Sequence, residues 1–251
     1  MIKIFSLFYK GKYSPDYVSK LYRGLKRNVK VPFKYIVYSD TRDIECDEII
    51  PIYKNKKIKE HWYKLRFFDS EFTGPGEIIV LDIDQIILKD ITEMVVWTVK
   101  QKELISYESW WNNSPVSING GWYKFQAGSF DYIWQKYIKD PLYWSEYYYN
   151  RSIVHFKYFG EQNFVEENVW DAGVGKQSGL ISHYPGEWVG KWTHNFDQNL
   201  TYQQLYRKKF NEEFMIIGDE INPKLKIVHF ANPDNSIHQN KYHWVNEYWN
   251  A

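Results

Sequence analysis

The sequence predicts a single α/β domain with a mostly parallel central sheet flanked by helices, in a Rossmann-like arrangement. One observation is the start of the chain, where two strand-like stretches enclose a helix-like one, a layout typical of nucleotide-binding folds. The other is the apolar run from Ile78 to Leu81, opened by the turn signal Gly74-Pro75-Gly76. Such a run is typical of a strand buried on both faces of a parallel sheet. No repeat or linker divides the chain, so we expect one domain over residues 1–251.

The N-terminal part of the chain supplies the first strands and helices. We expect strands over residues 2–8, 33–38 and 48–52, and a helix over residues 61–68 that leads into the strand ending before Asp82. Between the first two strands, Ser14 is expected to cap a helix, with Pro15 at its first position and Asp16 in its first turn.

The remainder of the chain continues the alternation of strands and helices. We expect strands over residues 103–107, 118–125, 180–184 and 226–230, and helices over residues 128–139, 160–169 and 202–214. The segment 141–158 is so rich in aromatic residues that its periodicity favours neither a helix nor a strand.

Composition limits the possible partners. Hydrophobic residues make up 44 % of the chain, enough for a sizeable core, while the formal charge of +1 gives no electrostatic case for binding nucleic acid or an anionic membrane. Cys46 is the only cysteine, which excludes a disulfide framework. We find no signal peptide and no apolar run long enough to span a membrane, so we expect a cytoplasmic protein without a transmembrane segment.

Asp82 and Asp84 are the strongest candidates for a functional site. Strand side chains alternate between faces, so both carboxylates should point the same way at the end of the buried strand. Ligands of open α/β sheets bind at that edge. Two carboxylates about 5 Å apart repel by roughly 3 kcal/mol at an effective dielectric of ~20, which a shared proton, a basic neighbour or a cation must offset. Oxygen ligands favour a hard divalent ion, Mg²⁺ or Mn²⁺.

Other candidate residues are less clear in isolation. His229 ends a late strand and could be a third metal ligand or a buried, hydrogen-bonded histidine. Lys64 could be solvated on its helix or could hold a phosphate beside the acidic site. The Asn119-Gly120-Gly121 segment indicates either a close approach of the backbone to a ligand or a bulge. We find no glycine-rich phosphate loop and no nucleophile motif, and the acidic neighbours of Cys46 should raise the pKa of its thiol.

Together these motifs resemble the GT-A glycosyltransferases, especially the glycogenin-like and bacterial lipopolysaccharide glycosyltransferase group. The resemblance covers most of the chain and rests on the Asp82-Ile83-Asp84 motif and five further elements in the same order. These elements are Tyr13 to Val18, Trp62 to Leu65, Asn119 to Gly121, Gly160 to Gln162, and Val228 to Phe230.

The resemblance implies a transferase that moves a hexose from a nucleotide sugar, with UDP expected as the nucleotide, to a glycan or another hydroxyl acceptor with retention of configuration. Residues 1–90 would form the nucleotide-binding half and residues 91–251 the acceptor-binding half. The implied metal ligands for Mn²⁺ or Mg²⁺ are Asp82, Asp84 and His229. The implied donor-binding residues are Tyr13 against the uracil, Lys64 and Asp82 at the diphosphate, Asn119 at the sugar, and Gly120. Glu161 and Gln162 are the implied catalytic residues, with Gln162 also bonded to the sugar and Glu161 next to its reacting carbon.

Two departures from the family pattern stand out. Glu161 occupies the position where the family has aspartate. After His229 the family has glycine and then Lys-Pro-Trp, whereas this chain has no lysine until Lys241. Either another basic residue substitutes at the diphosphate or donor binding is weaker.

Two functions of other classes fit parts of the sequence. A phosphatase of the haloacid-dehalogenase type would use Asp82 as nucleophile and Asp84 as acid/base with Mg²⁺, and Gly218-Asp219-Glu220 resembles its distal acidic motif. Against it, that family carries its aspartates on the first strand. A non-catalytic sugar-binding module would fit the 20 % aromatic content and the missing lysine.

Overall fold

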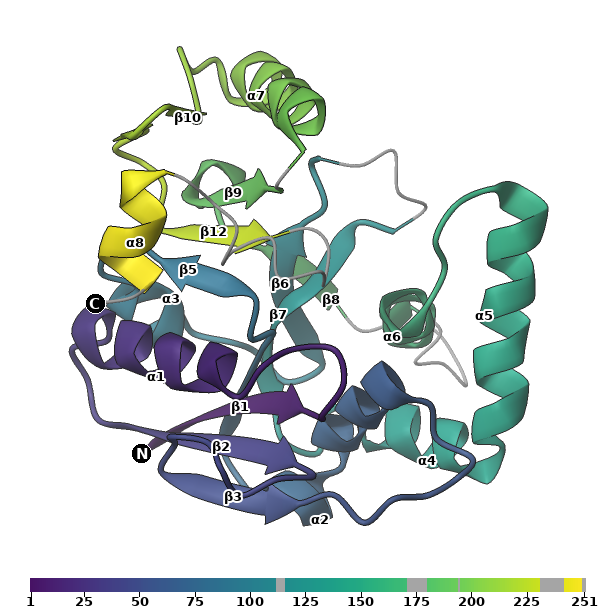
Figure 1. Cartoon of the computed structure of the whole chain (residues 1–251). Coiled ribbons are helices and arrows are strands. Elements are labelled where there is room, and N and C mark those ends of the chain that lie inside the picture. Colours follow the sequence, from purple (N-terminus) through teal and green to yellow (C-terminus); the bar gives the residue numbers. More distant parts are fainter. Residues whose placement is uncertain (112–115, 171–179, 194, 231–241, 250–251) are drawn as a thin grey trace.

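Seven strands form the central sheet, in the order β3-β2-β1-β4-β7-β6-β8 (Figure 1). This computed structural model describes residues 1–111, 116–170, 180–193, 195–230 and 242–249. Neighbouring strands run parallel except on either side of β7, which is antiparallel to both β4 and β6. The strands are β1 (Ile2–Phe8), β2 (Phe33–Ser39), β3 (Glu48–Pro51), β4 (Glu77–Leu81), β6 (Glu103–Glu108), β7 (Ile118–Gln126) and β8 (Leu180–His183).

The apolar strand β4 lies in the middle of this sheet and is buried on both faces, as the sequence predicts. It pairs in parallel with β1, where Lys3 to Ser6 lie opposite Ile78 to Leu81. Because side chains alternate, Ile79 and Leu81 join the core on one face of the sheet while Ile78 and Val80 join the core on the other.

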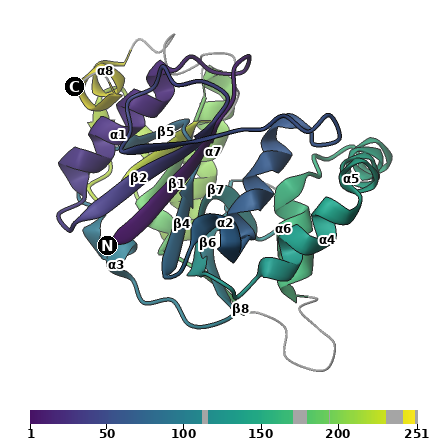
Figure 2. The same cartoon turned by 90° about the horizontal axis from the view of Figure 1, so that it is seen from below.

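Helices cover both faces of the sheet (Figure 2). The core on one face includes side chains of α1 (Asp16–Asn28), α3 (Thr92–Val96), α7 (Phe196–Phe210) and α8 (His243–Trp249). The core on the other face includes side chains of the 3₁₀ helix η1 (Glu60–Phe68), α4 (Asp131–Lys139), α5 (Pro141–His155) and α6 (Glu161–Trp170). The short elements α2 (Ser70–Thr73) and η2 (Gly186–Trp188) complete the helices of the described residues. None of the helices in these ranges is both long and apolar enough to cross a membrane.

A second, three-stranded sheet continues from the central one. It has the order β5-β12-β9, with β5 (Gln85–Ile87) antiparallel and β9 (Val189–Trp192) parallel to β12 (Ile227–Phe230). The chain leaves β4, passes through Asp82 and Asp84, and enters β5, so the aspartates lie where it changes sheets. The late strand β12 therefore belongs to the small sheet, not the central one. A separate hairpin pairs β10 (Ile216–Ile217) with β11 (Glu220–Ile221).

Several expected helices differ from the structure in detail. The helix α1 begins at Asp16, and Pro15, not Ser14, is its cap residue, with no capping side chain. The helix expected over residues 202–214 is α7, which begins earlier because Asn195 caps it by accepting a hydrogen bond from the amide of Gln198. Residues 60–68 form a 3₁₀ helix, and α4 begins three residues later than expected, at Asp131.

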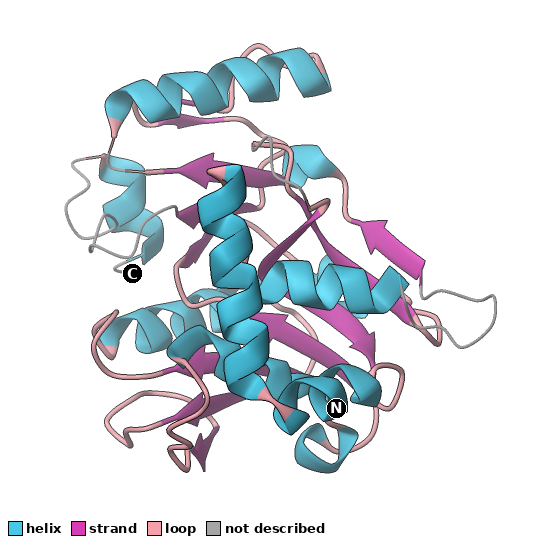
Figure 3. Cartoon of the chain, turned by 90° about the vertical axis from the view of Figure 1, so that its right-hand side faces the viewer, coloured by secondary structure: helices cyan, strands magenta, loops and turns pink. Residues whose placement is uncertain are grey.

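The aromatic segment that allowed no prediction is largely the helix α5, which runs along one side of the molecule (Figure 3). Asp140 caps it by accepting a hydrogen bond from the amide of Tyr143, and Pro141 takes the first helical position. Only Pro141, Ser145 and Tyr148 of α5 are buried. Since most of its other aromatic side chains are exposed, no apolar stripe marks the helix in the sequence.

Candidate active site

The backbone between β4 and β5 is held in place by its neighbours on both sides. The amide of Asp82 donates to the carbonyl of Gly121 in β7 at 3.1 Å, and the carbonyl of Asp84 accepts from the amide of Phe230 in β12 at 3.0 Å. The buried side-chain amide of Gln85 donates to the carbonyls of Asp82 and Gly121, and accepts from the hydroxyl of Tyr107. These bonds hold the main chain at both aspartates in one position between the two sheets.

Asp82, Asp84 and His229 come together in space. Each offers one ligand atom, and the three atoms lie within 4.8 Å of one another. Nε2 of His229 is 3.7 Å from Oδ1 of Asp84, whereas its Nδ1 is buried without a hydrogen-bond partner among the described residues. Burial, and then the nearby charge of Lys191, keep the pKa of His229 well below its usual value. A neutral imidazole and two carboxylates fit a divalent ion such as Mn²⁺ or Mg²⁺.

Lys64 connects the aspartates with the start of α6. Its buried ammonium forms an ion pair with Asp82, donates to the carbonyl of Gly120 at 2.5 Å and lies 3.6 Å from Oε1 of Glu161. Burial lowers the pKa of Lys64, but the attraction of Asp82 and Glu161 outweighs it and raises the pKa above its usual value. Burial raises the pKa of Glu161 even though Lys64 opposes this. Lys64 is therefore a permanent cation shared between two carboxyl groups.

Gly120 and Gly121 lie in a bulge of β7 and also approach the site closely, so both interpretations of the Asn119-Gly120-Gly121 segment apply. Tyr107 of β6 pairs with Asn119, whereas Ser106 pairs with Tyr123. A Cβ atom on Gly120 would lie 3.0 Å from Oε1 of Glu161, and one on Gly121 would lie 2.6 Å from Nδ1 of His229. Only glycine lets the backbone pass between these groups.

The polar groups of this bulge already have partners. The amide of Gly120 donates to Oε1 of Gln162 at 3.2 Å, and Oδ1 of Asn119 accepts from the amide of Gly121 at 2.9 Å. The side-chain N–H groups of Asn119 and Gln162 have no partner among the hydrogen bonds of the described residues, and both residues line the cavity.

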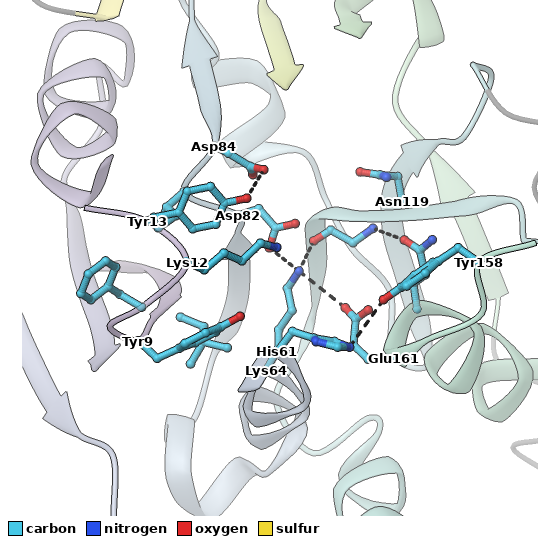
Figure 4. A pocket seen from close by; sticks show the side chains of 15 residues that line it. Tyr9, Lys12, Tyr13, His61, Lys64, Asp82, Asp84, Asn119, Tyr158 and Glu161 are labelled. Carbon is cyan, nitrogen blue, oxygen red and sulfur yellow. Dashed lines mark hydrogen bonds and ion pairs between the residues drawn. The ribbon is translucent and has the colours of Figure 1, made fainter. Parts of the chain in front are cut away.

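A cavity of about 210 Å³ lies between these groups (Figure 4). Every site residue predicted from the sequence lines it except His229, which contributes to the site through its proximity to the two aspartates. Tyr13 reaches it from the loop before α1, and its hydroxyl donates to Oδ2 of Asp84 at 2.8 Å. The predicted residues that line the cavity are Tyr13, Lys64, Asp82, Asp84, Asn119, Gly120, Glu161 and Gln162.

Four further polar side chains of the cavity were not assigned to the site from the sequence. Tyr9 and Lys12 line it from the segment after β1, His61 from η1, and Tyr158 from the segment before α6. Burial, together with the charges of Lys12 and Lys64, lowers the pKa of His61 to about 4. No local motif marks these residues, because their common position depends on three separate elements.

Two other expectations concern residues away from the cavity. Burial, with a smaller contribution from its acidic neighbours, raises the pKa of Cys46 to about 11, so its thiol is a poor nucleophile, as expected.

Asp219, from the acidic motif of the phosphatase hypothesis, lies in the turn between β10 and β11 and accepts hydrogen bonds from the amides of His243 and Trp244. Asp219 thus caps α8 and is not part of the cluster formed by Asp82, Asp84 and His229. The segment after His229 that lacks the expected lysine, 231–241, lies outside the described residues.

Comparison with known proteins gives matches only among solved structures. No protein-family model and no curated protein matches the sequence. The glycosyltransferase GlyE of Streptococcus pneumoniae TIGR4 matches with a TM-score of 0.67 and 12 % identity, over 100 % of this chain and 60 % of that one. The chain thus spans less than two thirds of the length of GlyE.

Two other glycosyltransferases share the architecture. The galactosyltransferase LgtC, solved in complex with donor and acceptor sugar analogs, has a TM-score of 0.56 and 11 % identity, over 92 % of this chain and 88 % of that one. The bifunctional glycosyltransferase WbbM has a TM-score of 0.52 and 10 % identity, over 99 % of this chain and 51 % of that one. Identities this low show the fold alone. The chain has the GT-A fold of these glycosyltransferases, which confirms the expected fold class.

Proposed function

We propose that this protein is a metal-dependent glycosyltransferase that moves a hexose from a nucleotide sugar, with UDP as the expected nucleotide, to a hydroxyl of a glycan or another acceptor. One observation carries the proposal. Ligand atoms of Asp82, Asp84 and His229 lie within 4.8 Å of one another, beside a cavity that Lys64 and Glu161 also line. The shared fold with solved glycosyltransferases supports it.

Asp82, Asp84 and His229 would hold Mn²⁺ or Mg²⁺. When bound, such an ion acts as a Lewis acid that stabilises negative charge on a diphosphate. Lys64 adds a fixed positive charge at the same place, because its ammonium is buried and paired with Asp82. Charges that are already oriented in a water-poor site stabilise a developing anion without reorganisation.

Glu161 and Gln162, at the first turn of α6, would hold the donor sugar. Oε1 of Gln162 is already bonded to the amide of Gly120, which leaves the side-chain N–H groups of Gln162 for a sugar hydroxyl. The carboxyl of Glu161 is buried beside Lys64 and can accept a hydroxyl proton in a hydrogen bond. We expect retention of configuration, by front-face attack or through a short-lived covalent intermediate.

Aromatic side chains at the cavity would form the acceptor side. Tyr9, His61 and Tyr158 line it, and Tyr158 has 61 % of its surface exposed. Exposed aromatic faces stack on sugar rings, so a glycan acceptor fits this part of the site.

The proposal is tested by mixing purified protein with Mn²⁺ and a panel of nucleotide sugars and measuring release of the nucleoside diphosphate. We expect slow hydrolysis of at least one donor in the absence of acceptor. Asp84→Asn should abolish this hydrolysis while the circular dichroism spectrum stays unchanged, because asparagine has the same shape but is a poorer metal ligand. Asp43→Asn, at an exposed loop position, is the matched control and should keep full activity.

Other outcomes separate the alternatives. Hydrolysis that persists in Asp84→Asn would rule out this site. No hydrolysis of any nucleotide sugar by the wild type would favour a non-catalytic sugar-binding module. Turnover of p-nitrophenyl phosphate with Mg²⁺ and without any nucleotide sugar would favour a phosphatase.

A further inference from the structure

Lys191 lies next to the metal-ligand cluster on a strand that the sequence did not predict. It belongs to β9, and its partner in the parallel register with β12 is His229. The residue is only 7 % exposed. An ammonium group buried to this extent loses hydration energy that a counter-charge or hydrogen bonds must replace.

The surroundings of Lys191 replace little of that hydration. Its Nζ lies 3.4 Å from the carbonyl oxygen of Phe230, a long hydrogen bond, and 5.2 Å from the centre of the Trp111 ring. Among the residues that the structure describes, no carboxylate forms an ion pair with Lys191. The other two buried lysines of these ranges, Lys64 and Lys124, each have one, with Asp82 and Glu77.

The charges of the site leave room for an anion near Lys191. Burial lowers the pKa of Lys191 to about 8, although the charges of Asp84 and Asp82 oppose this. Asp82, Asp84 and Glu161 carry three negative charges at most, whereas a divalent ion with Lys12, Lys64 and Lys191 carries five positive ones. A site loaded with its ion therefore has an excess of positive charge, which an anionic ligand would balance.

We infer that Lys191 binds the diphosphate group of the nucleotide-sugar donor, so that β9 supplies a cation beside the metal ligands. This inference rests on the proposed function. The indole N–H of Trp111 is buried without a hydrogen-bond partner among the described residues, and the Trp111 ring centre lies 6.3 Å from that of His229. The indole N–H of Trp111 is therefore a second buried donor near His229 that an anion could use. No lysine or arginine occurs in the sequence between Phe230 and Lys241, and among the lysines whose charges act on His229, which also include Lys64 and Lys12, Lys191 has the largest effect.

The test compares wild type and Lys191→Met by isothermal titration calorimetry. Methionine keeps the length of the apolar stem and removes the ammonium group, with its charge and its N–H donors. Each protein is titrated with Mn²⁺ alone, and then in saturating Mn²⁺ with UDP and with uridine. We expect the affinity for UDP to fall about ten- to a hundredfold, as for loss of a charged hydrogen bond, with uridine affinity unchanged. Affinity for Mn²⁺ alone should stay equal or rise, because a like charge has been removed.

A fall in UDP affinity without a fall in Mn²⁺ affinity separates a binding role from a structural one. Lys226→Met is the matched control, since Lys226 also lies over a tryptophan ring, that of Trp188, and pairs with Glu93; it should change neither affinity. Lys191→Gln gives the same readout if the methionine variant folds poorly.

Three results would overturn the inference. Equal UDP affinity in wild type and both Lys191 variants would leave the proposed function standing and remove the role of Lys191. Loss of Mn²⁺ and UDP affinity together would show that Lys191 only supports the structure. A wild type that binds Mn²⁺ but neither UDP nor any other nucleoside diphosphate would overturn the proposed function as well.

Discussion

The phenolic hydroxyl of Tyr13 donates a hydrogen bond of 2.8 Å to Oδ2 of Asp84, which lies 71 positions further along the chain. Burial and the charge of Asp84 raise the pKa of Tyr13, so its hydroxyl keeps its proton and remains a donor. The sequence suggested only that the Tyr13 ring packs on uracil. The structure adds a bond that orients one of the two aspartates from the loop before α1.

Tyr13→Phe should separate these two roles. The variant loses the hydrogen bond to Asp84 but keeps the ring, so we expect affinity for Mn²⁺ to fall about tenfold, as when an outer partner of a metal ligand is removed. Binding of uridine should not change. Calorimetric titration with each ligand measures both effects, and Tyr13→Ala should weaken both. Wild-type affinity for Mn²⁺ in Tyr13→Phe would show that Asp84 does not depend on this bond.

Lys64 should matter for stability as well as for donor binding. Lys64→Met leaves Asp82 and Glu161 without the cation that both face. Removing one partner of a buried pair costs about 3–5 kcal/mol, and we expect the lower end of this range because the Asp82 side chain is 34 % exposed. Urea denaturation of the metal-free protein measures the difference.

A double-mutant cycle serves as the control for Lys64. Adding Glu161→Gln to Lys64→Met removes one of the stranded carboxylates and should recover part of the lost free energy of unfolding. If the two losses simply add, the lysine and the glutamate are not coupled.

The sequence predicted those parts of the site that are set by local pattern. The apolar run from Ile78 to Leu81 predicted the buried strand. The alternation of side chains after this run predicted that Asp82 and Asp84 point the same way. The hydrogen bond from Tyr13 to Asp84 and the position of Lys191 beside His229 could not be predicted from local sequence pattern. β9 has only four residues, and the burial of Lys191 depends on β12, which follows it in the chain only after α7 and a hairpin. For α5, the exposed tyrosines hide the helical period that normally reveals a helix.

Acid should destabilise the metal-free protein partly through His61. Its folded-state pKa of about 4 lies below the usual 6.5, so the folded state binds fewer protons than the unfolded state between these values. Stability is therefore lost as the pH falls through this window. The raised pKa of Glu161 acts in the opposite direction, because protonation of Glu161 on acidification favours the folded state. Comparing a His61 variant with the wild type separates the contribution of His61 to this pH dependence from that of Glu161.

His61→Gln should lose less stability between pH 7 and pH 5 than the wild type does. The measurement is the urea midpoint at both pH values, in the presence of a chelator. The exposed His155 provides the control, since His155→Gln should leave the difference between the two midpoints as in the wild type. A wild-type pH response in His61→Gln would mean that other groups account for the loss.

Gly121 should tolerate no side chain, because of its contact with His229. A Cβ atom there would lie 2.6 Å from Nδ1 of His229 and 2.8 Å from Oδ1 of Asn119. Gly121→Ala must therefore displace the imidazole or the strand. We expect the free energy of unfolding to fall by about 1–3 kcal/mol and the affinity for Mn²⁺ to fall at least about tenfold.

Gly24→Ala is the matched control for this substitution. A Cβ atom at Gly24, in α1, would make only ordinary contacts, the nearest at 3.6 Å with Ile87. It should leave Mn²⁺ affinity unchanged and raise stability by up to about 1 kcal/mol, because alanine favours the helix over glycine. Denaturation and Mn²⁺ titration of both variants check the pair. Since β7 and β12 meet at Gly121 and His229, normal Mn²⁺ binding by Gly121→Ala would mean that His229 is not a ligand of the ion.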